Sequence, residues 1–197
     1  ERSRGLGDVY KRQIISKSGS PALFHCDAVQ AFGKVNLKPQ KLGVDLMSIS
    51  SHKIHGPKGV GALYIRKGAR IVPLHYGGEQ ERKIRPGTES LPLICAFAEA
   101  VKALPNIDDQ HEKIEELWNY CKEKVLEIPN VYINSPDGVL PYILNISAVG
   151  VRSETMLHYL AESGIYVSSG SACAKGKKSH VLTAMGLSPE RIDSAIR

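Results

Sequence analysis

The most constraining feature of this sequence is an apolar segment that ends abruptly in a cluster of polar residues. Residues 44–49 predict a buried strand, which is followed directly by Ser50, Ser51, His52 and Lys53. Glycines at positions 56, 59 and 61 then indicate a turn-rich loop. Ligands of open α/β sheets bind where strands end, and a lysine at such a point can be desolvated enough to act as an amine nucleophile. The segment therefore predicts an α/β fold with a site centred on Lys53.

A second strand end supplies a carboxylate. Residues 23–26 predict a short strand that ends at Asp27. Pyridoxal phosphate chemistry needs a lysine, a carboxylate that keeps the pyridine nitrogen protonated, and hydroxyl or imidazole groups for the phosphate. These chemical types are present in Asp27, Lys53, Ser50 and His52. Taken singly, each residue is more often structural, Lys53 as a solvated loop residue and Asp27 as a turn or cap aspartate.

The remaining pattern predicts alternating strands and helices. A third strand is expected at residues 60–65, and helices are expected at 90–104 and 108–128. Apolar residues recur at helical spacing in the second helix, which predicts that one of its faces is core. Smaller units follow, with strands at 131–133 and 142–146 and then a helix capped by Ser153 and ended by Gly164.

Four segments together resemble the NifS-like cysteine desulfurases, which belong to the pyridoxal phosphate fold type I superfamily. They are residues 24–34, 45–59, 82–89 (RKIRPGTE) and 168–174 (SSGSACA). The resemblance runs from about Ile14 to the last residue. It implies an α/β fold in which residues 14–108 are the C-terminal part of a large domain, with a mixed, mostly parallel sheet and helices. Residues 109–197 would then form a partial, smaller α+β domain, and the parent protein would be about twice as long.

The resemblance also assigns roles to individual residues. Lys53 would hold the cofactor covalently and move protons, while Asp27 would bind the pyridine nitrogen and Gln30 would donate to the phenolate oxygen. The remaining implied roles are phosphate binding for Ser50 and His52, phosphate binding in the neighbouring subunit of a homodimer for Thr88, substrate carboxylate binding for Arg197, and sulfur acceptance for Cys173.

The reaction that the resemblance implies converts L-cysteine to L-alanine and leaves the sulfur on Cys173 as a persulfide. A sulfur-acceptor or scaffold protein would then take the sulfur, for iron–sulfur clusters or thiolation. Two alternatives on the same fold, a class V aminotransferase and a selenocysteine lyase, use the lysine and aspartate but need no SSGSACA loop. An alternative of another class is a noncatalytic basic interaction module or an inactive fragment.

The surroundings of Cys173 distinguish it from the other three cysteines. Small residues precede it and lysines follow it, which predicts a mobile loop and favours the thiolate. We expect Cys26, Cys95 and Cys121 to be small buried side chains. The cysteines form no CxxC pair and the histidines show no ligand spacing, so neither a disulfide framework nor a metal site is expected.

Composition limits the remaining classes. With 197 residues and 42% hydrophobic content, the chain can bury a real core. No apolar run reaches the roughly 18 residues that a membrane helix needs, and no signal peptide is evident, so a cytoplasmic protein is expected. The net charge of +6 comes without a nucleic-acid motif and predicts a solvated surface with anion-binding positions. Residues 1–13 show no clear amphipathic period, and we excluded them from the fold as a non-native leader.

Overall fold

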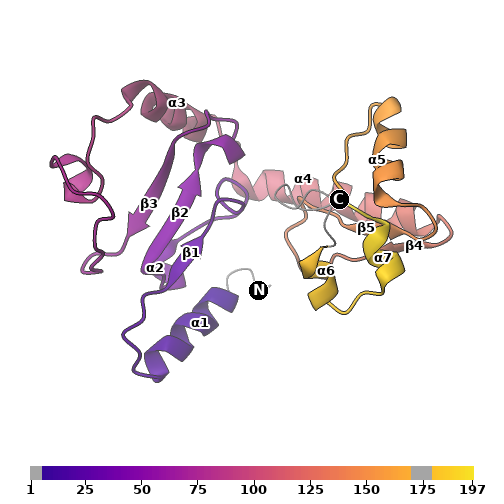
Figure 1. The fold of residues 1–197 in the computed structure, drawn as a ribbon, viewed down its shortest axis with the longest axis horizontal. Coiled ribbons are helices and arrows are strands. Elements are labelled where there is room, and N and C mark those ends of the chain that lie inside the picture. The colour runs from indigo at the N-terminus through magenta and orange to yellow at the C-terminus, as the bar shows by residue number, and fades with distance from the viewer. Residues whose placement is uncertain (1–5, 170–178) are drawn as a thin grey trace. The chain divides into compact units, whose positions relative to one another are not determined.

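The computed structural model describes residues 6–169 and 179–197. It divides into two compact units, residues 1–111 and 112–197, each of which contains helices and a three-stranded sheet (Figure 1). Helix α4 (Ile107–Leu126) spans the division. Along the described residues, no helix combines the length and the apolar character that crossing a membrane requires.

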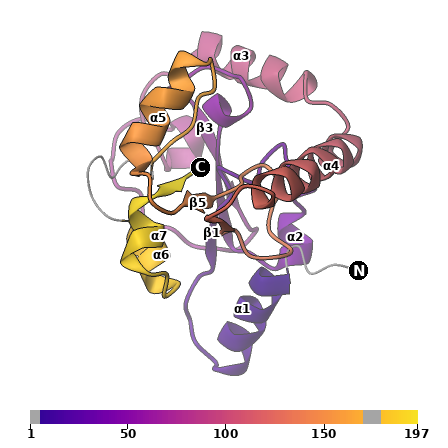
Figure 2. The same ribbon diagram turned by 90° about the vertical axis from the view of Figure 1, so that its right-hand side faces the viewer.

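Unit 1 is built around a mixed sheet in the order β1-β2-β3. Strand β1 is parallel to β2, whereas β3 is antiparallel to β2, so the expectation of a mixed sheet is confirmed and a parallel majority is not seen in these strands. In both views α1 and α3 lie toward opposite ends of this sheet (Figures 1 and 2). Its elements are α1 (Leu6–Lys17), β1 (His25–Asp27), α2 (Pro39–Leu42), β2 (Leu46–Ser50), the 3-10 helix η1 (Ser51–Lys53), β3 (Gly61–Ile65), the 3-10 helix η2 (Gln80–Lys83) and α3 (Leu91–Lys102).

The two faces of this sheet differ in polarity. Ala28, Val44 and Met47 form its buried cluster, against which Cys26 and Ile49 pack. Because side chains alternate along a strand, the residues between these positions lie on the opposite face. Strand register pairs Asp27 with Ser48, and Ser50 lies two residues further along β2. The opposite face therefore carries a row of polar side chains that ends at η1.

Helix α1 includes part of the segment that the sequence predicts to be a leader. Leu6–Lys17 is a single helix. The Arg12 guanidinium donates to the buried carboxylate of Asp45, with 2.9 Å between Nη1 and Oδ2. Residues 6–13 thus take part in the fold because an ion pair with a buried acceptor ties the helix to the sheet.

Unit 2 is an antiparallel sheet with short helices. It comprises β4 (Val131–Ile133), β5 (Ile146–Ala148), α5 (Ser153–Glu162), α6 (His180–Ala184), α7 (Pro189–Asp193) and β6 (Ala195–Ile196), with strand order β4-β5-β6. Strand β5 begins later than the expected 142–146, because the three residues of β4 pair with Ile146–Ala148. The N-cap of α5 is Arg152 rather than Ser153. Ser179 and Ser188 do cap α6 and α7 through their side chains.

Several side chains that were expected to be buried are exposed. Leu117 and Ile128 of the predicted core face are more than half exposed. Cys95 and Cys121 are also exposed, and Cys26 is half-buried. The expectation of buried cysteines is therefore wrong for Cys95 and Cys121, because helical spacing identifies an apolar face but not what covers it.

Candidate functional site

Two buried residues anchor the loop that carries Lys53. Ser51 and Ile54 are buried, and the Ser51 carbonyl oxygen accepts hydrogen bonds from the amides of Ile54 (3.0 Å) and Gly56 (3.1 Å). His52 and Lys53 lie between these anchors and are exposed. The end of β2 therefore presents the imidazole and the amine at the surface of unit 1 on a tightly fixed turn.

Two glycines allow the close packing of this turn. A Cβ at Gly56 would lie 2.0 Å from Ser51 Oγ, so a larger residue does not fit there. Gly33, in the segment after β1, has a φ of 76°, and a Cβ there would lie 2.8 Å from Ile54 Cγ2. Glycine tolerates this left-handed conformation without strain. The segment after β1 thus packs directly against the Lys53 turn.

Asp27 lies at the end of β1, next to the end of β2. The amide of Val29 donates to Asp27 Oδ1 (3.0 Å), and the amide of Ala28 donates to the Ser48 carbonyl (2.9 Å). The first bond orients the carboxylate and the second holds the two strand ends together. Asp27 is exposed, so its carboxylate is accessible to a cationic group of a ligand.

Two hydroxyl–imidazole pairs flank this carboxylate. Ser50 Oγ lies 2.6 Å from His52 Nδ1, and His25 Nε2 lies 2.7 Å from Ser48 Oγ. The first pair holds two groups that can bind a phosphate in a fixed relation. Sequence reasoning did not single out His25 and Ser48. Strand alternation would have found them, because both share the face of Asp27 and Ser50.

Gln30 is held by a neighbouring lysine. Lys34 Nζ donates to Gln30 Oε1 at 3.4 Å. Lys34 is half-buried, and burial followed by the positive charge of Lys53 lowers its pKa. Gln30 and Lys53 therefore belong to one electrostatic neighbourhood, although 23 positions separate them in the sequence.

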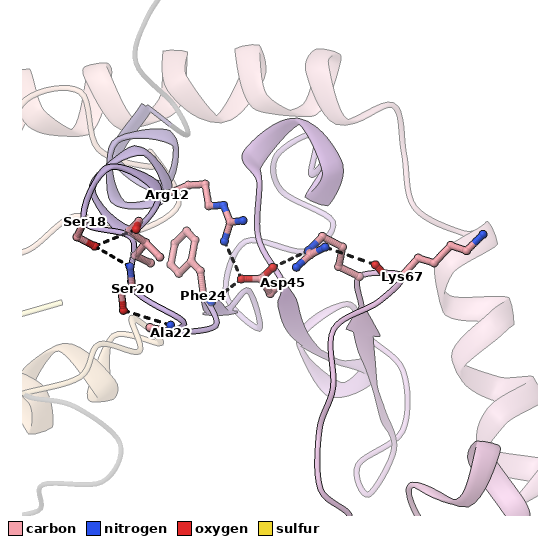
Figure 3. A network of polar contacts seen from close by, with 9 residues as sticks. Arg12, Ser18, Ser20, Ala22, Phe24, Asp45 and Lys67 are labelled. Atoms are coloured by element: carbon pink, nitrogen blue, oxygen red, sulfur yellow. Dashed lines mark hydrogen bonds and ion pairs between the residues drawn. The ribbon is translucent and has the colours of Figure 1, made fainter.

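A buried carboxylate fixes the other end of β2 (Figure 3). Asp45 is fully buried and accepts hydrogen bonds from the Phe24 amide (2.8 Å), Arg66 Nε (2.6 Å) and Arg12 Nη1 (2.9 Å). Burial acts to raise the pKa of Asp45, but these donors outweigh it and the pKa is lowered. The network joins the start of β2 to the segments before β1 and after β3, and so fixes the strands that end at the site.

The other predicted site residues lie elsewhere. Thr88 is exposed in unit 1, next to Gly87, whose φ is 108°. Arg197 belongs to unit 2, where its backbone exchanges two hydrogen bonds with Ser168 (2.8 and 2.9 Å). Cys173 lies outside the described residues. Within unit 1, Asp27 ends β1, Ser50 ends the adjacent β2, His52 and Lys53 lie in the turn that follows, and Gln30 lies in the segment after β1.

The types of residue in unit 1 fit pyridoxal phosphate. A carboxylate oriented by a backbone amide suits the pyridine nitrogen, an amide suits the phenolate oxygen, and a hydroxyl–imidazole pair suits the phosphate. The exposed amine of Lys53 is of the type that a covalent bond to this cofactor needs. Among the described residues, no three metal-ligating side chains are grouped as a metal site would require.

Comparison with known proteins defines the family. The family model described as aminotransferase class V matches residues 9–193. The chain belongs to the class V aminotransferase family. The matched region includes residues 9–13 of the predicted leader.

Relatives within this family are cysteine desulfurases. A cysteine desulfurase IscS of Dictyoglomus turgidum is 44% identical over 199 residues, covering 98% of this chain and 50% of that protein. The cysteine desulfurase IscS of Methanosarcina thermophila is 43% identical, covering 98% of this chain and 47% of that protein. A solved NifS-like protein from Rickettsia africae has a TM-score of 0.82 and 34% identity, covering 96% of this chain and 51% of that one. The chain thus spans about half the length of the curated relatives it matches.

Proposed function

We propose that the whole protein containing this chain is a pyridoxal phosphate-dependent cysteine desulfurase that converts L-cysteine to L-alanine. The observation that carries the proposal is the arrangement in unit 1, where Lys53 and the Ser50–His52 pair lie at the end of β2 and the oriented carboxylate of Asp27 ends the adjacent strand β1. The similarity to proteins named cysteine desulfurase supports the choice of reaction within the family.

The residues of unit 1 divide the work of binding and proton transfer. Asp27 holds the pyridine nitrogen protonated, Gln30 donates to the phenolate oxygen, and Ser50 with His52 binds the phosphate. When bound, the cofactor supplies an electron sink for negative charge at the substrate α-carbon. Lys53 would hold the cofactor covalently, and its amine would move the proton at the substrate α-carbon.

Cys173 and Arg197 would act on the substrate itself. The Arg197 guanidinium binds the substrate carboxylate. The backbone of Arg197 is held by hydrogen bonds to the backbone of Ser168. The Cys173 thiolate attacks the substrate sulfur, so that a sulfur–sulfur bond forms while the bond from sulfur to the substrate β-carbon breaks. Protonation of that carbon gives L-alanine. The Cys173 thiol and L-cysteine together contain the same atoms and electrons as L-alanine and the Cys173 persulfide. The reaction therefore requires no external oxidant.

The proposal includes a cytoplasmic homodimer and transfer of sulfur from Cys173 to an acceptor protein. The segment before Thr88 supports the dimer, because Val72, Leu74 and Tyr76 are 79%, 91% and 81% exposed. Apolar side chains gathered in one exposed segment are typical of an interface. Thr88 in the same loop would reach the phosphate bound by the partner subunit.

A product assay with the whole protein tests the function. With pyridoxal phosphate, L-cysteine and a reducing thiol, we expect equal amounts of L-alanine and sulfide to form without a keto acid. An aminotransferase would instead require a keto acid as amino acceptor and would release no sulfide. Selenocysteine lyase activity would appear as turnover of selenocysteine with none of cysteine. Either result would overturn the proposal.

The adjacent serines Ser50 and Ser51 offer a matched test of the phosphate site. Ser50→Ala is expected to weaken cofactor binding about 10-fold, because a hydrogen bond to a charged group is lost. Ser51 Oγ is buried and has no hydrogen-bond partner among the described residues, so Ser51→Ala is expected to change cofactor affinity less than about 2-fold. Absorbance titration of the apo protein with pyridoxal phosphate measures both constants. Equal effects of the two substitutions would contradict the assignment of Ser50.

A further inference from the structure

The backbone sets Gln30 and Lys34 on the same side of one turn. The amide of Phe32 donates to the Ala28 carbonyl (2.9 Å). The amides of Lys34 and Val35 both donate to the Ala31 carbonyl (3.0 and 3.1 Å). These bonds wind the segment after β1 into successive turns, and the left-handed Gly33 (φ 76°) lies between Gln30 and Lys34. The hydrogen bond from Lys34 Nζ to Gln30 Oε1 follows from this geometry.

The Lys34 side chain is partly withdrawn from solvent next to the Lys53 turn. It is half-buried and follows Gly33, which packs against Ile54 of the Lys53 turn. The charge of Lys53 contributes to lowering the pKa of Lys34, after burial. The hydrogen bond to Gln30 Oε1 places the Lys34 ammonium beside Gln30, and the effect of Lys53 on the pKa of Lys34 agrees with a position on the same side of unit 1.

A cation beside a glutamine decides which end of the amide faces the ligand. The amide has an oxygen that only accepts and a nitrogen that only donates, and an ammonium can bond only to the oxygen. With Oε1 held by Lys34, the amide nitrogen of Gln30 must be the end that is available to another partner. A phenolate oxygen needs that donor, whereas a reversed amide would set two oxygens against each other.

We propose that Lys34 is a positioning residue that holds the Gln30 carbonyl oxygen so that the Gln30 amide nitrogen donates to the cofactor's phenolate oxygen. The inference rests on the proposed function, because it presumes pyridoxal phosphate at Lys53. It gives a role to a lysine that the sequence motifs did not single out.

The test measures the pH midpoint of the visible absorption band of lysine-bound cofactor in the loaded whole protein. Loss of the Lys34 ammonium leaves more negative charge on the phenolate oxygen. That charge stabilises the proton on the Lys53 nitrogen that bonds the cofactor. Lys34→Met is therefore expected to raise the midpoint by about half a unit or more. Lys34→Arg keeps a cation that can donate to the Gln30 oxygen, so its midpoint is expected to stay close to that of the native protein. Asp27, His25 and His52 are the other titratable groups described at this site, and all three stay unchanged in these variants.

A double-substitution cycle separates positioning from a direct effect of charge. In a Gln30→Ala background, Lys34→Met is expected to cause less than half of its shift in the native background, because its partner is already absent. Lys38→Met, which removes an exposed lysine of the same unit, is the control and should leave the midpoint unchanged. If Lys34→Met does not fold, Lys34→Gln removes the same charge.

Three results would overturn the inference. They are an unchanged midpoint in Lys34→Met, a shift of equal size in the Gln30→Ala background, and an equal shift in Lys38→Met. Failure of the unsubstituted protein to bind pyridoxal phosphate would instead reject the proposed function, so the two failures are distinguishable.

Discussion

Replacement of Lys53 by alanine is expected to reduce turnover of L-cysteine by a factor of about 10⁴ or more in the whole protein. The substitution removes both the amine that bonds the cofactor and the base that moves the α-proton. Ser51 and Ile54 anchor the turn from either side, so the backbone of the site should persist. The visible band of lysine-bound cofactor should disappear together with activity.

The control for this substitution is Lys58→Ala. Lys58 lies five positions after Lys53 and is also exposed, but no ligand contact is proposed for it. It should keep both the absorption band and the activity. A cofactor adduct that borohydride can still trap in Lys53→Ala would show that another lysine bonds the cofactor and would reject the assignment.

Replacement of Asp45 by alanine is expected to lower the free energy of unfolding of the apo protein by about 2–3 kcal/mol. The Phe24 amide would lose its acceptor, and Arg66 and Arg12 would lose their partner. The penalty stays below that of a fully buried pair, because the two arginine side chains are 43% and 34% exposed and can be hydrated. Denaturant unfolding of the two proteins measures the difference.

The same carboxylate gives a signed pH dependence. The folded pKa of Asp45 is lowered, so its contribution to stability is fully present above the unfolded value of about 3.9 and is lost as the pH falls through the folded value. Below about pH 4, the deficit of Asp45→Asn relative to the native protein should therefore shrink. Arg66→Ala and Arg12→Ala form a matched pair. Arg66→Ala measures how much the bond from the residue after β3 contributes to the free energy of unfolding, and Arg12→Ala measures the contribution of the bond from α1. A deficit independent of pH would contradict the role of the ionised carboxylate.

The local site was predictable from the sequence because its chemistry lies at strand ends. An apolar run that stops at Ser50 and a second one that stops at Asp27 sufficed to expect both groups at one edge of a sheet. The structure has both strands, in parallel and adjacent, with Asp27 opposite Ser48. The loop anchors were less visible, because burial of Ser51 depends on Gly56 and on packing that periodicity does not encode.

Other features required tertiary information. Helix α1 has no clear amphipathic period, and its attachment includes an ion pair with Asp45 and packing against α2, neither of which the sequence shows. The exposure of Cys95 and Cys121 reflects which faces of α3 and α4 are covered in this chain, and sequence spacing does not determine that. The bond between Lys34 and Gln30 depends on the successive turns after β1, which our strand and helix assignments did not include.

The central claim is that the sulfur of L-cysteine reaches Cys173 through chemistry at Lys53. Mass spectrometry of the whole protein after one turnover, without reductant, tests this most directly. We expect one added sulfur on the peptide that contains Cys173, and none in Lys53→Ala or Cys173→Ser. The exposed Cys95 and Cys121 are the internal controls, because both are accessible to nonspecific sulfur transfer. Sulfur on either of them in place of Cys173, or an unchanged yield of L-alanine and persulfide from Cys173→Ser, would contradict the account.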